Sequence, residues 1–207
     1  MNIKVSKNKI IAHRAGLQIC DSLFEQYDID QERFYGLTNG LYSLISIIHA
    51  ILKKTGKADV VISTWSAGFY DIHAMDELKK SGLINNMTIV IDRSYKTRQS
   101  QYSHKLEDIF GLENIRTTNT HAKFVLISND KYNITVLSSM NLNENKRCES
   151  FQIEIEKSIY DLFYDFVKEL FTKQSIGIIE SREIVDKVFD DIFDEPDTDW
   201  RDVKLEW

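Results

Sequence analysis

Several features that would place this chain in a specialised class are missing from its sequence. A single proline, Pro196, and only eight glycines among 207 residues leave no segment that looks like a flexible linker between domains. The two cysteines, Cys20 and Cys148, form neither a metal-binding nor a disulfide pattern, which fits a reducing compartment. The start of the chain has no apolar signal-peptide core, and the longest apolar run, 41–52, is shorter than the ~20 residues that span a bilayer. We therefore expect one globular domain in the cytoplasm, without a membrane anchor.

The net charge of −6 argues at first against a nucleic-acid partner, but it is confined to the end of the chain. Residues 190–207 hold eight acidic and two basic residues, which accounts for the whole excess, so residues 1–189 are balanced. We predict a main domain over 1–189 and an acidic tail over 190–207, which either solubilises the chain or docks on a basic surface. A phosphate-binding face on the main domain remains compatible with this composition.

Hydrophobic periodicity predicts alternating strands and helices. The run Ala58–Thr64 is short, β-branched and almost continuously apolar, as expected for a buried parallel strand. A helix is predicted before it at Leu41–Lys54, another after it at Tyr70–Ser81, and a further strand at Met87–Ile91. Strand–helix–strand at this spacing indicates a parallel sheet with right-handed crossovers.

Both ends of the main domain carry weaker patterns. A basic strand opens the chain, a helix is predicted around His13–Tyr27, and Arg33–Gly40 is rich in turn-forming residues. Near the other end, Phe151–Glu156 alternates like a strand with one wet face. Two amphipathic helices follow, around Ile159–Leu170 and over Ser181–Phe193, and their aromatic stripes are typical of core or dimer packing.

The most informative stretch is Thr120–Phe151. It predicts two apolar strands, Phe124–Ser128 and Ile134–Ser138, joined by a polar turn. Five polar residues lie around these strands. His121 and Lys123 stand at the start of the first strand, Ser139 and Asn141 follow the second, and Glu149 lies farther on. A hairpin requires none of them, so they are candidates for a functional site.

These five side chains are of the types that phosphoryl transfer needs. His121 can attack phosphorus if a carboxylate orients its ring, and Glu149 is the nearest candidate. Lys123 projects to the same side of the strand and offers a cation to phosphate oxygens, while Ser139 and Asn141 can donate hydrogen bonds to developing charge. Such chemistry needs mostly positioning, so the set predicts a site without a metal or other cofactor. Singly, each residue fits a strand edge, turn or helix cap equally well; all five in order favour the phosphate site.

The same positions resemble the signature of the phospholipase D superfamily, His-x-Lys-x4-Asp followed by Gly-Ser-x-Asn and a downstream Glu. The matching residues are His121, Lys123, Ser139, Asn141 and Glu149. Arg147 fits the Asn-x-Arg-x-Glu ending of several members, whereas Ser128 replaces the Asp, which mainly supports the structure there, and Ser138 replaces the Gly. The resemblance covers about thirty residues. It implies a three-layer α/β/α sandwich with a mixed, largely parallel sheet, here with a helical C-terminal extension, and a catalytic role for the main domain.

A second stretch, Arg93–Lys105, follows the strand predicted at Met87–Ile91. It contains no acidic residue, and tyrosines interleave its four cations, Arg93, Lys96, Arg98 and Lys105. Cations and aromatics at a strand's carboxyl end suit a nucleic-acid backbone; a solvated loop leading into a helix around His104–Phe110 is the alternative. Ser66, in the small-residue loop after Ala58–Thr64, either contacts a substrate phosphate or caps the next helix.

The chain carries one His-x-Lys, whereas the resemblance implies an active site built from two. We therefore predict a homodimer in which two His121 residues face each other, one as nucleophile and one as general acid and base. The predicted function is metal-independent phosphodiester hydrolysis of DNA or RNA, because single-motif members of the superfamily are often nucleases. Two other functions fit the sequence: a nucleic-acid-binding module of the same fold without turnover, and a structural protein that engages a partner through its C-terminal helices.

Overall fold

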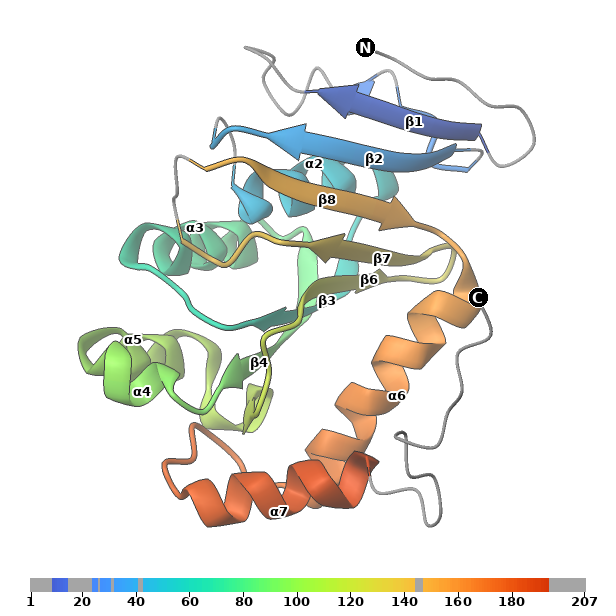
Figure 1. The fold of residues 1–207 in the computed structure, drawn as a ribbon. Coiled ribbons are helices and arrows are strands. Elements are labelled where there is room, and N and C mark those ends of the chain that lie inside the picture. Colours follow the sequence, from blue (N-terminus) through green and yellow to red (C-terminus); the bar gives the residue numbers. More distant parts are fainter. Residues whose placement is uncertain are drawn as a thin grey trace.

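The computed structural model describes residues 9–14, 24–25, 27–30, 32–40, 43–143 and 147–193. The chain after Phe193, and thus most of the predicted acidic tail, lies outside the described residues. Within them, one sheet has the strand order β1-β2-β8-β7-β6-β3-β4-β5 (Figure 1). The strands are β1 (Lys9–Arg14), β2 (Glu32–Thr38), β3 (Ala58–Thr64), β4 (Ile84–Asp92), β5 (Ile115–Thr118), β6 (Lys123–Ser128), β7 (Asn133–Ser138) and β8 (Glu149–Glu154). The helices are α2 (Leu44–Thr55), α3 (Phe69–Lys80), α4 (Tyr95–Arg98), α5 (Ser100–Phe110), α6 (Lys157–Lys173) and α7 (Arg182–Phe193), with a 3₁₀ turn, η1, at Leu112–Asn114.

The sheet is mixed, as predicted. β1 pairs with β2, β3 with β4 and β4 with β5 in parallel, whereas β6 is antiparallel to both β3 and β7, and β8 to both β7 and β2. It follows that only β6 and β8 run against the direction of the other strands. The starts of β6 and β8 therefore lie at the same edge of the sheet as the ends of β3, β4 and β7. That edge receives the polar residues of the central stretch.

Alternation along the strands divides the hydrophobic core into two layers. Val60 and Ile62 of β3 pack with α2, α3 and α5 on one face of the sheet, whereas Val61 packs with α6 and α7 on the other. The second layer is aromatic: the rings of Phe124 and Phe163 have centroids 4.8 Å apart. Helices thus cover both faces, and the three-layer α/β/α sandwich is confirmed (Figure 1). Of the aromatic residues of the C-terminal helices, Phe163, Phe166 and Phe171 pack against the second layer, whereas Tyr164 and Phe193 are exposed.

Helix α2 and strand β3 agree closely with the sequence-based prediction. Helix α2 begins after Ser43, whose Oγ accepts a hydrogen bond from Ser46 N at 3.3 Å, and it ends at Gly56, where a φ of 85° favours glycine. The next strand, β3, has the predicted bounds, Ala58–Thr64. These elements therefore form for the local reasons that their sequence pattern indicates.

Three segments differ from the expectation. His13 lies in β1, not in a helix, although most of the helix predicted around it lies outside the described residues. The segment predicted as a turn, Arg33–Gly40, forms most of β2, because it pairs with β1 on one side and β8 on the other. Its Gly36 makes room for the ring of Phe151, which a Cβ would overlap. The basic stretch Arg93–Lys105, for which a solvated loop was the alternative, is mostly helical: α4 and α5 occupy it from Tyr95 on, with a break at Gln99.

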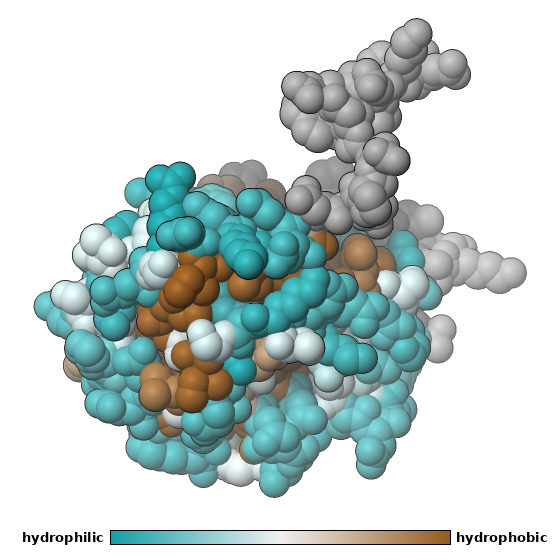
Figure 2. Space-filling model, turned by 90° about the horizontal axis from the view of Figure 1, so that it is seen from below, coloured by the Kyte–Doolittle hydropathy of each residue, from teal (hydrophilic) through white to brown (hydrophobic). Residues whose placement is uncertain are grey.

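The surface on the side of α7 carries an irregular apolar area among polar residues (Figure 2). Helix α7 itself exposes Ile184 and Phe193. Across the described ranges, no helix combines the length and the apolar composition needed to cross a bilayer.

Candidate active site

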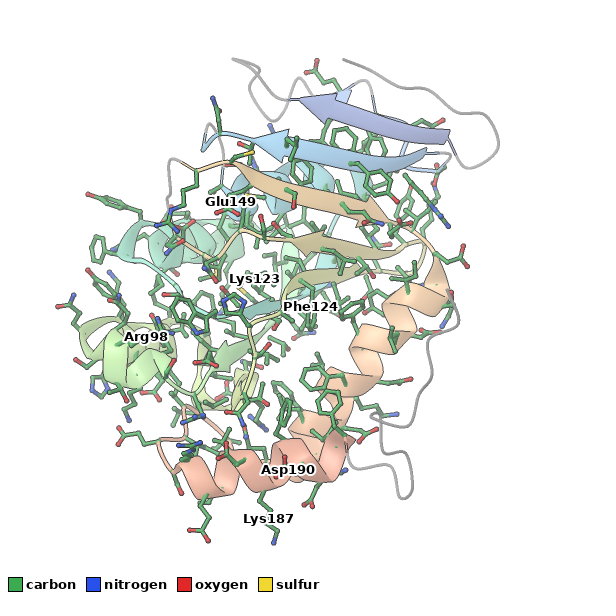
Figure 3. The ribbon with its side chains drawn as sticks, viewed as in Figure 1. Arg98, Lys123, Phe124, Glu149, Lys187 and Asp190 are labelled. Carbon is green, nitrogen blue, oxygen red and sulfur yellow. The ribbon has the colours of Figure 1, made fainter. Side chains whose placement is uncertain are left out.

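The sheet topology brings the residues of the central stretch to one edge. His121 immediately precedes β6 and Lys123 opens it, Ser139 follows β7, and Glu149 opens β8. In the sheet register Lys123 lies opposite Ser138, and Ser138 lies opposite Phe151. Figure 3 shows Lys123 and Glu149 at the same end of these strands. Residues that are up to 28 positions apart in the sequence are thus neighbours at the ends of three adjacent strands.

His121 and Lys123 are in direct contact. Lys123 Nζ lies 2.9 Å from His121 Nδ1 and 3.3 Å from Nε2, and it donates a hydrogen bond to the backbone oxygen of His121 at 2.7 Å. His121 is exposed, whereas Lys123 is only 9% exposed. Burial lowers the pKa of Lys123, and the nearby charge of Glu149 opposes that shift. A partly desolvated ammonium beside an accessible imidazole is well placed to hold a phosphate oxygen.

Ser139 and Glu149 form a hydrogen-bonded pair beside these residues. Ser139 Oγ donates to Glu149 Oε2, and it accepts from Ser150 N at 2.9 Å. Ser139 N donates to the oxygen of Ser150 at 3.0 Å, so the residue is fixed to β8 by its backbone as well. Within the described part of the chain, Glu149 shares no hydrogen bond with His121, so the carboxylate that was expected to orient the ring instead orients Ser139. Contacts with Lys123 and with Trp65 position the histidine.

Asn141 lies next to a backbone junction between two loops. Leu142 N donates to the oxygen of Ser66 at 3.1 Å, and Gly68 N donates back to the oxygen of Leu142 at 2.5 Å. Ser66 thus contributes a backbone contact that ties the loop after β3 to the segment after β7. The side-chain oxygen of Asn141 is buried and has no hydrogen-bond partner among the residues that the structure describes, which is costly for a purely structural residue.

Trp65 contacts the candidate site, although it belongs to none of the sequence motifs. Its ring centroid lies 5.6 Å from that of His121. The guanidinium carbon of Arg98 lies over the Trp65 ring, 3.7 Å from its centroid. Arg98 also donates to the backbone oxygen of Trp65 at 2.8 Å. The one signal in the sequence was a large aromatic residue within the small-residue loop at the end of a buried strand.

The four predicted nucleic-acid-binding cations are not gathered into one track. Arg93 hydrogen-bonds to Asn119 and lies 3.8 Å from Asp186 of α7, and Lys96 pairs with Glu180 at 2.9 Å. Lys105 contacts His73 of α3. Of the four, Arg98 is the one that contacts a neighbour of His121, and Figure 3 shows it on α4, beyond the strand ends that carry Lys123 and Glu149.

The two positions that depart from the superfamily signature both have structural contacts. Ser128 Oγ accepts a hydrogen bond from the hydroxyl of Tyr160 on α6 at 3.0 Å. Ser138 Oγ accepts from Met140 N at 3.0 Å and donates to the oxygen of Ser150 at 3.1 Å, which shapes the turn leading to Ser139. Among the residues that the structure describes, no group of three or more His, Cys, Asp or Glu side chains could hold a metal ion.

Solved structures of several other proteins have a similar fold. Nuc from Salmonella typhimurium, a phospholipase D family member, is 15% identical, with a TM-score of 0.50 over 71% of this chain and 98% of its own. The chain has a phospholipase D-like fold. NucT from Helicobacter pylori is 14% identical, with a TM-score of 0.51 over 72% of this chain and 100% of its own. Polyphosphate kinase from Porphyromonas gingivalis is 15% identical, with a TM-score of 0.53 over 75% of this chain but only 29% of its own.

No protein-family model and no curated protein matches the sequence. The likeness to solved structures therefore concerns the fold, and the choice of chemistry depends on the side chains at the strand ends.

Proposed function

We propose that this protein is a metal-independent phosphodiesterase that cleaves nucleic acid, with His121 as its nucleophile. The observation that carries the proposal is the convergence of His121, Lys123, Ser139 and Glu149 at one sheet edge of a phospholipase D-like fold. Each of them has a role in phosphoryl transfer, and the imidazole is exposed to solvent.

The reaction proceeds in two displacements. A ring nitrogen of His121 attacks phosphorus, the phosphorus–oxygen bond to one nucleoside breaks, and a phosphohistidine intermediate carries the other nucleotide. Lys123 holds a phosphate oxygen as a fixed cation. The Ser139 hydroxyl turns its single hydrogen from Glu149 to the phosphate oxygen on which charge develops. Water then attacks phosphorus, the phosphorus–nitrogen bond breaks and His121 is released.

A second histidine completes the proton transfers. The leaving oxygen needs a proton in the first step, and water must lose one in the second. Because the chain contains a single His-x-Lys, we assign both transfers to the partner's His121 in a homodimer. The exposure of His121 and Ser139 is compatible with a second copy facing them across the site.

Cleavage assays in excess EDTA test the nucleophile. Wild type should cleave at least one of single-stranded DNA, double-stranded DNA and RNA, and His121→Ala should reduce the rate by at least about a thousandfold, because it removes the group that forms the covalent bond. His104→Ala is the matched control, since His104 is an exposed histidine on α5, and it should retain the wild-type rate. Cleavage by His121→Ala at the wild-type rate would overturn the proposal.

Mixed dimers test the shared site. Wild type and His121→Ala are co-expressed in varied ratios, and activity is measured against the wild-type fraction. If each site needs two His121 residues, mixed dimers are inactive and activity falls as the square of that fraction. A linear fall would show that each chain works alone.

A further inference from the structure

Next to the candidate site, helices α3 and α5 carry four aromatic side chains and a lysine in contact, which we call the Phe69 cluster: Phe69, Tyr70, His73, Tyr102 and Lys105. Phe69, Tyr70 and His73 are exposed, and the other two are half-buried. Phe69 is 41% exposed and Tyr70 is 71% exposed, which is unusual for large aromatic side chains. Their rings meet edge to face, with centroids 5.7 Å apart, and Phe69 also contacts the rings of His73 at 4.5 Å and Tyr102 at 6.1 Å. Phe69 is thus held from several sides, while Tyr70 is left open to solvent.

Positive charge lies directly on this cluster. Lys105 Nζ is 4.2 Å from the centroid of the Phe69 ring and contacts His73 Nε2. Residues 65–73 and 93–105, which supply the cluster and its surroundings, contain one acidic residue, Asp71, and that residue is buried. The surface therefore combines exposed aromatic rings with cations, and these two segments contribute no exposed carboxylate to it. Such a surface is complementary to a polynucleotide, which is an anionic chain of aromatic bases.

The cluster continues from the candidate site through Trp65. Trp65 contacts His121, and Phe69 follows Trp65 by four residues, so their Cα atoms are at most about 14 Å apart. Arg98 stacks on Trp65 at the end of α4, and Tyr102 lies on α5, which begins after the break at Gln99. A strand whose scissile phosphate lies at His121 would reach Tyr70 within a few nucleotides, with Arg98 beside the path.

We infer that the Phe69 cluster binds a single-stranded polynucleotide, with an unpaired base stacked on Tyr70 and the backbone phosphates beside Lys105 and Arg98. This inference builds on the proposed function, because it names the form of nucleic acid that the site takes. Exposed ring faces favour single strands, since a base in a duplex is already stacked and paired and its face is not available. Phe69 supports the Tyr70 ring from its edge, and Lys105 fixes Phe69 in place.

The test measures binding of a fluorescent oligothymidylate by anisotropy, on protein carrying His121→Ala so that no cleavage intervenes. Tyr70→Ala should weaken binding about tenfold, which is the scale for loss of one base–aromatic stack, and Tyr70→Phe, which keeps the ring, should stay within about twofold. Tyr164→Ala is the matched control, because Tyr164 is an exposed tyrosine on α6, and it should have no effect. A base-free sugar–phosphate oligomer of equal length should bind Tyr70→Ala and the parent equally.

Three results would overturn the inference: no binding of oligothymidylate, equal binding by Tyr70→Ala and its parent, or an equal loss with the base-free oligomer. Tighter binding of a duplex, with the same dependence on Tyr70, would also contradict it.

Hydrolysis of bis(p-nitrophenyl) phosphate separates this inference from the proposed function, because that small diester does not reach Tyr70. Tyr70→Ala with His121 intact should hydrolyse it at the wild-type rate. Tyr70-dependent binding without any turnover would refute the phosphodiesterase and leave the stacking site standing.

Discussion

Two regions of this molecule carry the residue types of a phosphate site, and they differ in what those residues contact. At the strand ends, Lys123 contacts His121 and Ser139 contacts Glu149, and the charge of Glu149 is close enough to act on Lys123. In the basic stretch, Arg93 and Lys96 are paired with Asp186 and Glu180, which come from the C-terminal part of the chain. The comparison teaches that Arg93 and Lys96, whose charges are already matched within the protein, contribute less to a phosphate site than Lys123 does.

Removing one lysine from each region tests most directly whether the two regions differ in function. Lys123→Met should lower kcat/KM for an oligonucleotide by about a hundred- to a thousandfold, the usual effect of losing one donor to the reacting phosphate. Lys96→Ala should stay within about twofold, because Glu180 already neutralises it. Since Lys123 is buried, circular dichroism must show that Lys123→Met is folded. Equal losses in the two variants would mean that the regions do not differ.

The pH dependence of kcat/KM sharpens the role of Lys123. Burial lowers its pKa from the ordinary value of 10.5, so its charge is lost as the pH rises through that lowered value, before an exposed lysine would titrate. We expect wild-type activity to fall on the alkaline side below pH 10.5. Lys123→Arg should be less active but should lack this alkaline fall, because a guanidinium keeps its charge. An identical alkaline fall in Lys123→Arg would assign the titration to another group.

Ser139 and Glu149 should behave as one unit. Ser139→Ala and Glu149→Gln should each reduce kcat about tenfold, and the double variant should be little worse than either, because the carboxylate acts by orienting the hydroxyl. The measurement is a double-mutant cycle on kcat. Fully multiplicative losses would show that Glu149 acts independently of Ser139.

The smallest effect on catalysis is expected where α7 meets the basic stretch. Hydrogen bonds from Asn119 and Arg182 lower the pKa of Asp186, so its contribution to stability is present above the ordinary value of 3.8 and is lost as the pH falls through the lowered value. Asp186→Asn should lower the melting temperature by a few degrees at neutral pH, and less in acid. Asp165→Asn, an exposed aspartate on α6, is the control. A large change in kcat for Asp186→Asn would show that this contact supports the active site directly.

The sequence predicts that these side chains gather at one edge of the sheet because strands repeat every two residues. Once the two apolar strands of the β6–β7 hairpin are recognised, the side chains that enter and leave them must share an edge. The pairing of Ser139 with Glu149 was not predictable, since it depends on the hydrogen bonds between Ser139 and Ser150 across β7 and β8.

Contacts between distant segments were equally hidden. Asp186 and Glu180 lie more than eighty residues beyond the cations that they neutralise, and no local pattern links them. Trp65 belongs to a loop whose position depends on its hydrogen bonds to Leu142. The strand β2 was mistaken for a turn because Gly36, which usually indicates a turn, serves here to admit the Phe151 ring.

The most direct test of the central claim is to trap the covalent intermediate. An oligonucleotide substrate is mixed with excess enzyme, the reaction is quenched in alkali, which preserves phosphorus–nitrogen bonds, and the peptides are examined by mass spectrometry. The account predicts a nucleotide fragment bonded through phosphorus to His121, present during turnover and missing in His121→Ala. Turnover of the substrate without any adduct on His121, or an adduct on another residue, would contradict it.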